Sequence, residues 1–409
     1  MEFASGQEAR DLGLVRVGNR ALVFSQGLDP VVTVDWQGRV VYLVSRGRTF
    51  HRGLDGSWLE KTLTEGGLPV ARAVRTSSEI ASLLERACAT ITVLGGNALS
   101  GRSGTAIHGT GDSPERQLQT WLEQRPIATP ADHATDALRF RQVYDPVPIL
   151  PPDQYRAVVL EAASGCPWNA CRFCTLYERQ TYRVRSGDEF CKHTARVIEF
   201  LGGGLSFRRS VFLGGGSVAR LMPETLAERA RSARRMLREA GSTEEWTFHA
   251  FADAFTPSAW PPAALARLRA EGFRRFHIGV ESGCQALLEA VRKPQTCRHV
   301  TELIMNLKAA GLAVGCILLT GLGGQRFAED HVRETLELIH HLPLSAQDIV
   351  YLSPFTSENP TRLVDDSLIE PLSPDALRGQ EARLRDGLLS LRRSRGFQVA
   401  RYDLRQFVY

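Results

Sequence analysis

Three cysteines with the spacing C-x4-C-x2-C carry the clearest chemical signal in this chain. Cys166, Cys171 and Cys174 follow Ala157–Ala162, an apolar run that predicts a β-strand, so the thiols are expected on a strand-to-helix loop. Thiolates bind transition metals, and a cubane iron–sulfur cluster normally takes four of them. Three thiolates on one loop therefore suit a cluster in which one iron stays available to another ligand.

The cysteines also allow three other interpretations. A structural zinc ion would need a fourth Cys or His at short spacing, and the nearest candidate, His193, falls within a predicted helix. A thioredoxin-like pair would use Cys171 and Cys174 and leave Cys166 unexplained. Simple burial of the thiols fits poorly, because Cys-Arg-Phe-Cys on a polar loop makes a poor core. Zinc and burial stay open as alternatives at this point.

From Arg156 onward, short apolar runs alternate with longer helical patterns. The runs predict strands at Ala157–Ala162, Ser210–Leu213, Trp246–Phe251, Arg275–Val280, Ala313–Thr320 and Ile349–Ser353. The segments between them predict helices at Gly187–Gly202, Pro223–Ala240, Pro262–Glu271, Gln285–Val291, Arg298–Ala310 and Ala328–His340. Such repeats predict an α/β fold with a parallel sheet. Six strand–helix units are too few for a closed eight-fold barrel, so we expect a partial (β/α)6 parallel barrel. Ligands of such folds bind at the carboxyl ends of the strands.

The residues before the barrel have a different pattern. Residues 1–145 are expected to form an N-terminal, mostly β (α+β) module, with a hairpin turn at Trp36–Arg39, a helix at Thr76–Cys88 and a loop over residues 95–117. A proline-rich linker is expected at 146–155, the barrel at 156–360, and a C-terminal helix and closing strand at 361–409. The N-terminal module, placed before the barrel, is interpreted as a possible substrate cap.

The composition is that of an ordinary soluble protein. The 409 residues carry 50 basic and 45 acidic side chains, a net charge of +5, which does not by itself predict nucleic-acid binding. No apolar run approaches the roughly 20 residues that span a bilayer, and the first residues contain no apolar signal core, so we expect a cytoplasmic protein with no membrane partner. In a reducing compartment the eight cysteines indicate metal ligands, reactive thiols or buried side chains.

The cysteine segment resembles the radical S-adenosylmethionine (SAM) superfamily, whose usual first gap is one residue shorter. Phe173, before the third cysteine, matches an aromatic residue of that family. Gly214–Gly216 follow the second predicted strand where the family has its Gly-Gly motif, although Ser217 replaces the usual acidic residue. The stretches "FHIGVESG" and "LLTGLGG", around Glu281 and Gly321, resemble a subset that includes oxygen-independent coproporphyrinogen oxidases, the Elongator radical enzyme and methylthiotransferases.

The resemblance implies cofactors and site residues. Cys166, Cys171 and Cys174 would hold a 4Fe–4S cluster whose free iron binds SAM. The implied SAM contacts are Phe173, Gly214, Gly215, Gly216, Ser217, Glu281, Ser282, Lys293, Leu319 and Gly321. In the family, the reduced cluster cleaves SAM to a 5′-deoxyadenosyl radical, which abstracts hydrogen from a substrate. An external electron donor such as flavodoxin or ferredoxin is implied, and no further catalytic residue is assigned.

We expect the substrate to be a small molecule. An RNA-modifying enzyme is an alternative, but no stacking pattern of aromatic and basic residues supports it. A haem or cluster carrier that keeps the fold without turnover is another. His249 and Asp253, near the end of the third predicted strand, are expected on the cofactor side, where either a substrate contact or a structural role is possible.

Overall fold

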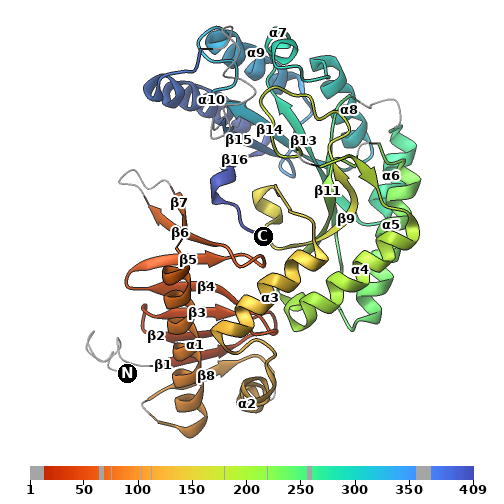
Figure 1. The fold of residues 1–409 in the computed structure, drawn as a ribbon. Helices are drawn as coiled ribbons and strands as arrows, with labels where there is room; N and C mark the ends of the chain where they lie inside the picture. Colours follow the sequence, from red (N-terminus) through yellow and green to blue (C-terminus); the bar gives the residue numbers. More distant parts are fainter. Residues whose placement is uncertain are drawn as a thin grey trace. The chain divides into compact units, whose positions relative to one another are not determined.

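The computed structural model describes residues 13–63, 69–74, 76–102, 104–111, 113–178, 180–218, 220–255, 260–355 and 370–409 (Figure 1). The chain forms two compact units. The N-terminal unit consists of Met1–Val147, Ala195–Arg209 and Arg405–Tyr409, and the barrel unit consists of Pro148–Thr194 and Ser210–Leu404. No helix in the described ranges is long and apolar enough to cross a bilayer.

The N-terminal unit is built on one sheet with the strand order β7-β6-β5-β4-β3-β2-β1-β8. Its strands are β1 (Gly13–Val17), β2 (Leu22–Gln26), β3 (Val31–Val34), β4 (Val40–Ser45), β5 (Arg48–Arg52), β6 (Trp58–Leu63), β7 (Pro69–Val74) and β8 (Ala106–Gly109). The first seven form an antiparallel meander, and β8 pairs with β1 in parallel. The expected hairpin between β3 and β4 is confirmed, and Asp35 supports its turn by accepting from the backbone N–H groups of Gln37 and Arg39.

Three helices complete this unit: α1 (Ser77–Ser100), α2 (Pro114–Gln124) and α3 (Pro130–Val143). The apolar face of α1 packs against β1–β4 and forms the core with Leu83, Ala87 and Ile91 (Figure 1). The loop expected over residues 95–117 is wrong, because α1 continues to Ser100 and β8 and the start of α2 follow. A Cβ at Gly95 would lie 2.9 Å from Leu122 Cδ1, so this glycine permits a close contact between helices and does not mark a loop.

The expected partial barrel is confirmed. Six parallel strands follow one another in sequence order: β9 (Ala157–Gly165), β11 (Ser210–Gly216), β12 (Phe248–Ala252), β13 (Phe273–Glu281), β14 (Ala313–Thr320) and β15 (Ile349–Pro354). The short β10 (Arg183–Val184) pairs antiparallel with β9. The closing strand β16 (Gln398–Arg401) is a further parallel strand beside β15. It therefore belongs to the barrel sheet, although the sequence grouped it with a separate C-terminal segment.

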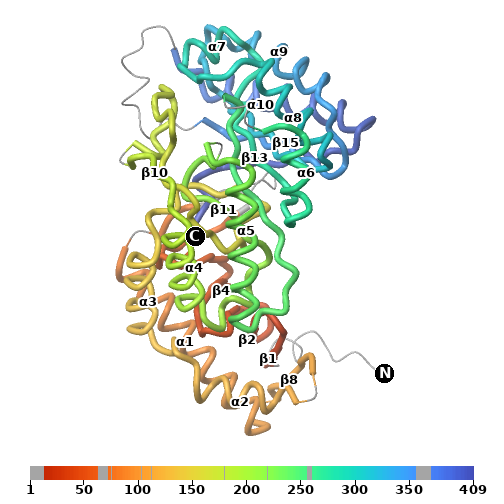
Figure 2. The backbone as a smooth tube through the Cα atoms, turned by 90° about the vertical axis from the view of Figure 1, so that its right-hand side faces the viewer, coloured from red at the N-terminus to blue at the C-terminus, as the bar shows by residue number. Residues whose placement is uncertain are grey.

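Helices cover the outer side of this curved sheet (Figure 1). They are α4 (Gly187–Leu201), α5 (Pro223–Glu239), α6 (Pro262–Ala270), α7 (Gln285–Ala290), α8 (Cys297–Ala309), α9 (Ala328–His341) and α10 (Pro374–Arg395). Contacts run from α5 to α6, from α6 to α8 and from α9 to α10 (Figure 2). Short 3-10 helices occupy Pro152–Gln154, Gly202–Phe207 and Leu404–Gln406. Strands such as β15 are buried along their whole length, as expected for a sheet covered on both faces.

The proline-rich segment 146–155, expected to be a linker, is divided between the two units. Its second half is built into the barrel, where Asp153 accepts hydrogen bonds from Arg275, His277 and Tyr351. A carboxylate that accepts from several donors is held in one position. This half of the segment is therefore part of the barrel structure.

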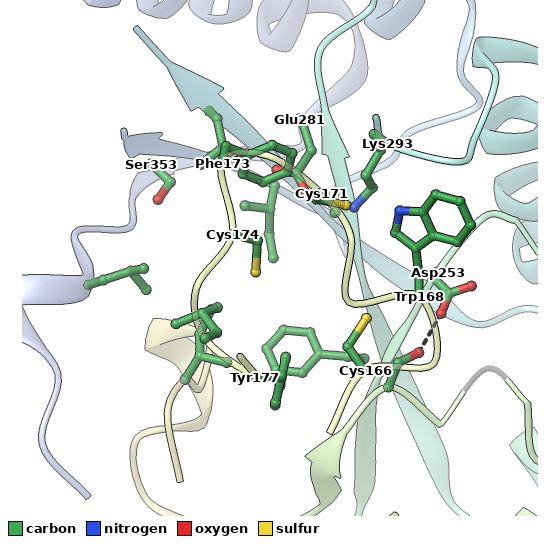
Figure 3. Close-up of a pocket in the computed structure, with 18 of the residues that line it drawn as sticks. Cys166, Trp168, Cys171, Phe173, Cys174, Tyr177, Asp253, Glu281, Lys293 and Ser353 are labelled. Carbon is green, nitrogen blue, oxygen red and sulfur yellow. Dashed lines mark hydrogen bonds and ion pairs between the residues drawn. The ribbon is translucent and has the colours of Figure 1, made fainter. Parts of the chain in front are cut away.

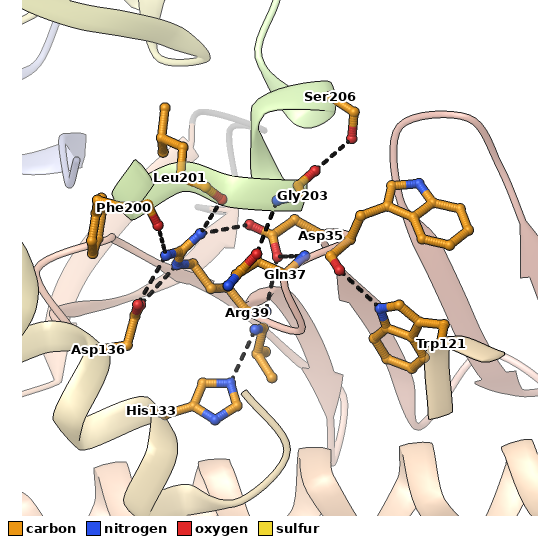
Figure 4. Close-up of polar contacts among 12 residues, drawn as sticks. Asp35, Gln37, Arg39, Trp121, His133, Asp136, Phe200, Leu201, Gly203 and Ser206 are labelled. Atoms are coloured by element: carbon orange, nitrogen blue, oxygen red, sulfur yellow. Dashed lines mark hydrogen bonds and ion pairs between the residues drawn. The ribbon is translucent and has the colours of Figure 1, made fainter. Parts of the chain in front are cut away.

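A buried arginine organises part of the N-terminal unit (Figure 4). The Arg39 side chain donates to both carboxylate oxygens of Asp136, at 2.7 and 2.9 Å, and to the carbonyl oxygens of Phe200 and Leu201 at the end of α4. Gln37 accepts a hydrogen bond of 2.9 Å from the Gly203 backbone. These bonds satisfy carbonyl groups that the helix end leaves without intrahelical partners. They place the segment Ala195–Arg209 in this unit.

Candidate active site

A cavity of about 250 Å³ opens at the carboxyl ends of the barrel strands (Figure 3). Its polar lining residues are Cys166, Cys171, Cys174, Thr175, Tyr177, Ser217, Asp253, Glu281, Lys293, Ser353 and Tyr402. Its apolar lining residues include Ile149, Trp168, Phe173, Phe251, Phe255, Ile317, Leu319, Phe355 and Leu404. The three cysteines and several of the other expected site residues thus line one cavity at this end of the sheet.

The three cysteines of the loop after β9 all line this cavity, and their sulfur atoms surround a common space (Figure 3). The longer first gap contains Asn169, which has a left-handed φ of 46° that asparagine tolerates well. Its backbone N–H donates to Cys166 Sγ at 3.4 Å, and its side-chain amide donates to the Tyr177 carbonyl at 2.8 Å. The additional residue is therefore accommodated in an ordered turn.

The donor set fits an iron–sulfur cluster. Burial raises the pKa of Cys171 to about 12 and also raises the pKa of Cys174, so a bound cation would be needed to hold these thiols as thiolates. Among the described residues, no three Cys, His, Asp or Glu side chains lie close enough together to hold a single metal ion. In a cubane, each thiolate binds a different iron. The fit therefore depends on whether the three thiols face one space, and they do.

Two hydrogen bonds pin the cysteine loop to the segment after α7. The Trp168 indole N–H donates to the Arg292 carbonyl at 2.9 Å, and the Arg172 backbone N–H donates to the Val291 carbonyl at 2.9 Å. Arg292 itself has a positive φ of 54°. The next residue, Lys293, lines the cavity, so the loop and this lysine are positioned together.

Lys293 forms a buried ion pair with Glu281, the last residue of β13. The Lys293 Nζ and Glu281 Oε1 atoms are 2.9 Å apart, and the two side chains are 11% and 9% exposed. A Cβ at Gly279 would lie 2.3 Å from Glu281 Oε1, so this glycine makes room for the pair. Glu281 has a φ of 62°, a strained value for a side chain of its size. Burial opposes the charge of Lys293, but Glu281, together with smaller contributions from Cys171 and Asp253, raises the lysine pKa.

A second polar pair lies on the cavity wall. Ser217 donates a hydrogen bond of 2.6 Å to Asp253, and both residues line the cavity. Asp253 is therefore on the expected side, but His249 is not. His249 is the second residue of β12, far from its carboxyl end, and it does not line the cavity. Burial lowers its pKa to about 3, which keeps the ring neutral.

Five of the ten implied SAM contacts line the cavity: Phe173, Ser217, Glu281, Lys293 and Leu319. The other five, Gly214, Gly215, Gly216, Ser282 and Gly321, are not among the lining residues. Ser282 shares a hydrogen bond of 2.7 Å with His331 of α9, and Gly321 donates to Gln380 of α10. These two therefore have structural partners on helices.

The glycine triplet also differs from its expected position. Gly214–Gly216 are the last residues of β11, whereas the sequence placed them past the strand end. A Cβ at Gly216 would lie 2.0 Å from the Gly165 carbonyl oxygen, and one at Gly215 would lie 2.4 Å from that of Ala163. The glycines therefore allow β11 to lie close to β9 where the cysteine loop begins.

Several cavity residues were missed from the sequence. Trp168 lies within the cysteine loop, but its bond to Arg292 could not be foreseen. Tyr402 follows β16 directly, and the same strand-end rule would have found it if β16 had been assigned to the barrel sheet. Ile149 comes from the segment taken as a linker.

Comparisons with known proteins give one family match and several structural similarities. Residues 160–339 match the family model of the Radical SAM superfamily. Coproporphyrinogen III oxidase from Escherichia coli is similar over 62% of this chain and 55% of its own, with 16% identity and a TM-score of 0.40. Methylornithine synthase is similar over 75% and 85%, with 17% identity and a TM-score of 0.36. HydG, a maturase of the FeFe-hydrogenase, is similar over 80% and 71%, with 12% identity and a TM-score of 0.38.

The chain spans about half the length of the Escherichia coli oxidase, and identities of 17% or less do not indicate a shared substrate. No curated protein matches the sequence. The matched residues begin within β9, include the cysteine loop and the Glu281–Lys293 pair, and end within α9. Residues 160–339 of this chain are a domain of the radical SAM superfamily.

Proposed function

We propose that this protein is a radical SAM enzyme that abstracts hydrogen from a small-molecule substrate, with a 4Fe–4S cluster held by Cys166, Cys171 and Cys174. The observation that carries the proposal is the convergence of these three thiols on one cavity at the carboxyl ends of the strands. The cysteine loop and the Glu281–Lys293 pair, which line this cavity, lie within the matched residues 160–339.

When bound and reduced, the cluster supplies the electron that cleaves SAM to a 5′-deoxyadenosyl radical. The residues of the chain would hold the cluster and bind SAM. Three thiolates leave one iron position for the SAM amino acid group. Phe173, Ser217, Glu281, Lys293 and Leu319 line the space where SAM would be bound. We retain these five as SAM contacts, with the Glu281 carboxylate as the acceptor for ribose hydroxyls.

Part of the cavity wall is apolar. Phe251, Ile317 and Leu404 form part of the lining and offer no exchangeable polar group. A reactive radical is protected from side reactions in such surroundings. The electrons would come from an external protein donor such as flavodoxin or ferredoxin.

Metal content tests the proposal first. After anaerobic reconstitution, the full chain should hold about four irons and four sulfides. Replacing Cys166, Cys171 and Cys174 together by alanine should abolish this content. Cys191→Ala is the matched control, because Cys191 lies in α4 and does not line the cavity. Iron retained by the triple variant, or zinc as the bound metal, would contradict the assignment.

Product analysis then separates the alternatives. The reduced, reconstituted protein should release 5′-deoxyadenosine from SAM, and the triple cysteine variant should not. A fully loaded cluster without this product would favour a non-catalytic carrier of haem or a cluster. RNA that copurifies and is removed by nuclease would favour an RNA-modifying enzyme.

A further inference from the structure

The cavity is lined by a buried phenol whose hydroxyl has no acceptor in the part of the chain that the structure describes. Tyr402 directly follows β16, lines the cavity and is 1% exposed. Its hydroxyl has no hydrogen-bond partner among the described residues. Burying an unsatisfied hydroxyl is costly, so native structures rarely keep one without a reason. Because the residue lines the cavity, a ligand in the cavity can supply the missing acceptor.

The hydroxyl of the neighbouring Tyr351 has a partner within the barrel. The Tyr351 ring packs edge-on against Tyr402, with 5.7 Å between ring centroids, and its hydroxyl donates to Asp153 Oδ1 at 2.7 Å. Asp153 also accepts from Arg275 at 2.6 Å and shares a hydrogen bond of 3.0 Å with His277. Among the described residues, the barrel thus provides a partner for the hydroxyl of Tyr351 and none for that of Tyr402, a residue that lines the cavity. This contrast makes Tyr351 a natural control for Tyr402.

Tyr402 can act only as a protonated donor or as an acceptor. Burial raises its pKa well above the ordinary tyrosine value, with a smaller contribution from neighbouring tyrosines and Asp153. The phenol therefore keeps its proton at neutral pH. A neutral phenol in apolar surroundings forms its best hydrogen bond with a carbonyl, carboxylate or similar acceptor.

The surroundings of Tyr402 define the rest of the ligand. Ile317 belongs to the same buried apolar cluster as Tyr402, and Ile149, Phe251 and Leu404 pack against that cluster. All four also line the cavity. The charged Glu281–Lys293 pair and the Ser217–Asp253 pair line the same cavity, outside this cluster. The part beside Tyr402 therefore suits an apolar group that carries one acceptor.

We propose that Tyr402 is a substrate-binding residue that donates a hydrogen bond to an oxygen or nitrogen acceptor on an otherwise apolar part of the substrate. This assignment rests on the proposed function, because it places the substrate in the radical SAM cavity. The expected substrate class is a molecule with a hydrocarbon or aromatic group that carries a carbonyl-type acceptor. Tyr402 lies outside the matched residues 160–339.

A stability comparison distinguishes a ligand-binding hydroxyl from a structural one. Tyr402→Phe removes a hydroxyl for which the described residues provide no partner, so the melting temperature of the ligand-free full chain should stay within about 2 °C of the wild type or rise. Tyr351→Phe removes a hydrogen bond to a carboxylate and should lower it by about 3–10 °C. Equal losses in the two variants would overturn the assignment, because they would show that the Tyr402 hydroxyl also stabilises the fold.

A pair of small probes tests the donor directly. Acetophenone has an apolar ring and a carbonyl acceptor, and ethylbenzene has the ring alone. Binding to the full chain is measured by ligand-detected NMR, as purified and after cluster reconstitution, without reductant. The preference for acetophenone over ethylbenzene should be about 2- to 12-fold larger in the wild type than in Tyr402→Phe, as expected for one neutral hydrogen bond.

The outcomes separate this inference from the proposed function. An unchanged preference in Tyr402→Phe, or failure of both probes to bind, would overturn the role of Tyr402 even if the protein cleaves SAM. A preference that depends on Tyr402 would support the role even if 5′-deoxyadenosine never forms, because the probe measurement needs no electron transfer. In that case the apolar binding site would stand and only the proposed radical chemistry would be refuted.

Discussion

The buried pair of Lys293 and Glu281 makes the sharpest energetic prediction. The two charges are 2.9 Å apart and about nine-tenths buried. Their gross attraction is about 6 kcal/mol at an effective dielectric constant of about 20. Most of this is offset by the cost of removing both groups from water, so the pair itself stabilises the fold far less than that. Removing only one partner leaves the other charge buried without compensation.

The perturbation is Lys293→Met, which keeps the length and apolar stem of the side chain. We expect the free energy of unfolding to fall by about 3–5 kcal/mol at pH 7, and Glu281→Gln to give a loss of similar size. The double variant should be more stable than the sum of the two losses implies, by about 2–3 kcal/mol. Urea denaturation of the full chain measures all four proteins.

The direction in which the pKa of Lys293 is shifted determines the pH at which the measurement should be made. The folded-state pKa of Lys293 is raised above its ordinary value of 10.5. Its contribution is therefore complete below pH 10.5 and is lost only as the pH rises through the folded-state value. At pH 7 the whole effect is present. Losses that add within about 0.5 kcal/mol in the double variant would refute the reasoning, because they would show that the two charges do not interact.

Two further predictions concern the N-terminal unit. Hydrogen bonds from Arg48 and Arg72 lower the pKa of Glu60 from 4.5 to about 2. Glu60→Gln should therefore lower the free energy of unfolding by about 1–2 kcal/mol at pH 7, once screening by solvent is allowed for. The difference in unfolding free energy between this variant and the wild type should be complete above pH 4.5 and should vanish as the pH falls toward 2. Urea denaturation at a series of acidic pH values measures it, and a difference that does not change with pH would contradict the prediction. Arg39→Met leaves Asp136 buried without its charged partner and should lower the free energy of unfolding by about 3–5 kcal/mol, against less than about 0.5 kcal/mol for the exposed control Arg116→Met. Similar urea midpoints for these two arginine variants would show that Arg39 does not hold the unit together.

The barrel was predictable because its signals are local. Several parallel strands are buried on both faces and appear in the sequence as short apolar runs, so Ala313–Thr320 was predicted with the bounds that β14 has. The carboxyl-end rule then placed the cysteine loop and Glu281 on one side of the sheet. The remaining boundaries differ by a few residues, mostly because strands such as β9 and β13 extend into the site.

The predictions failed where a residue's role depends on a distant partner. Gly95 and Gly96 resemble loop residues in the sequence, but Gly95 allows Leu122 to approach helix α1. Asp153 follows a run of prolines, and its partners Arg275 and Tyr351 are more than 100 residues away. His249 and Asp253 are four residues apart, the first within β12 and the second directly after it, and only Asp253 reaches the cavity. No local pattern contains this information, because it depends on the register of the folded sheet.

The N-terminal unit is built from segments that are far apart in the sequence, and this affects how its role can be tested. As a substrate cap, residues 1–145 would be dispensable for cofactor chemistry and could be removed by cutting near Asp145. The structure argues against that cut, because Ala195–Arg209 belong to the same unit and Arg39 binds the carbonyl groups of Phe200 and Leu201. Deletion would expose these two fully buried apolar side chains at the end of α4. The helix α4 begins only a short distance after the cysteine loop, so a truncated chain would disturb the cluster and the unit together. Substitutions on the surface of the N-terminal unit that leave Arg39 and its partners intact are therefore the informative way to ask whether the unit contributes to substrate turnover.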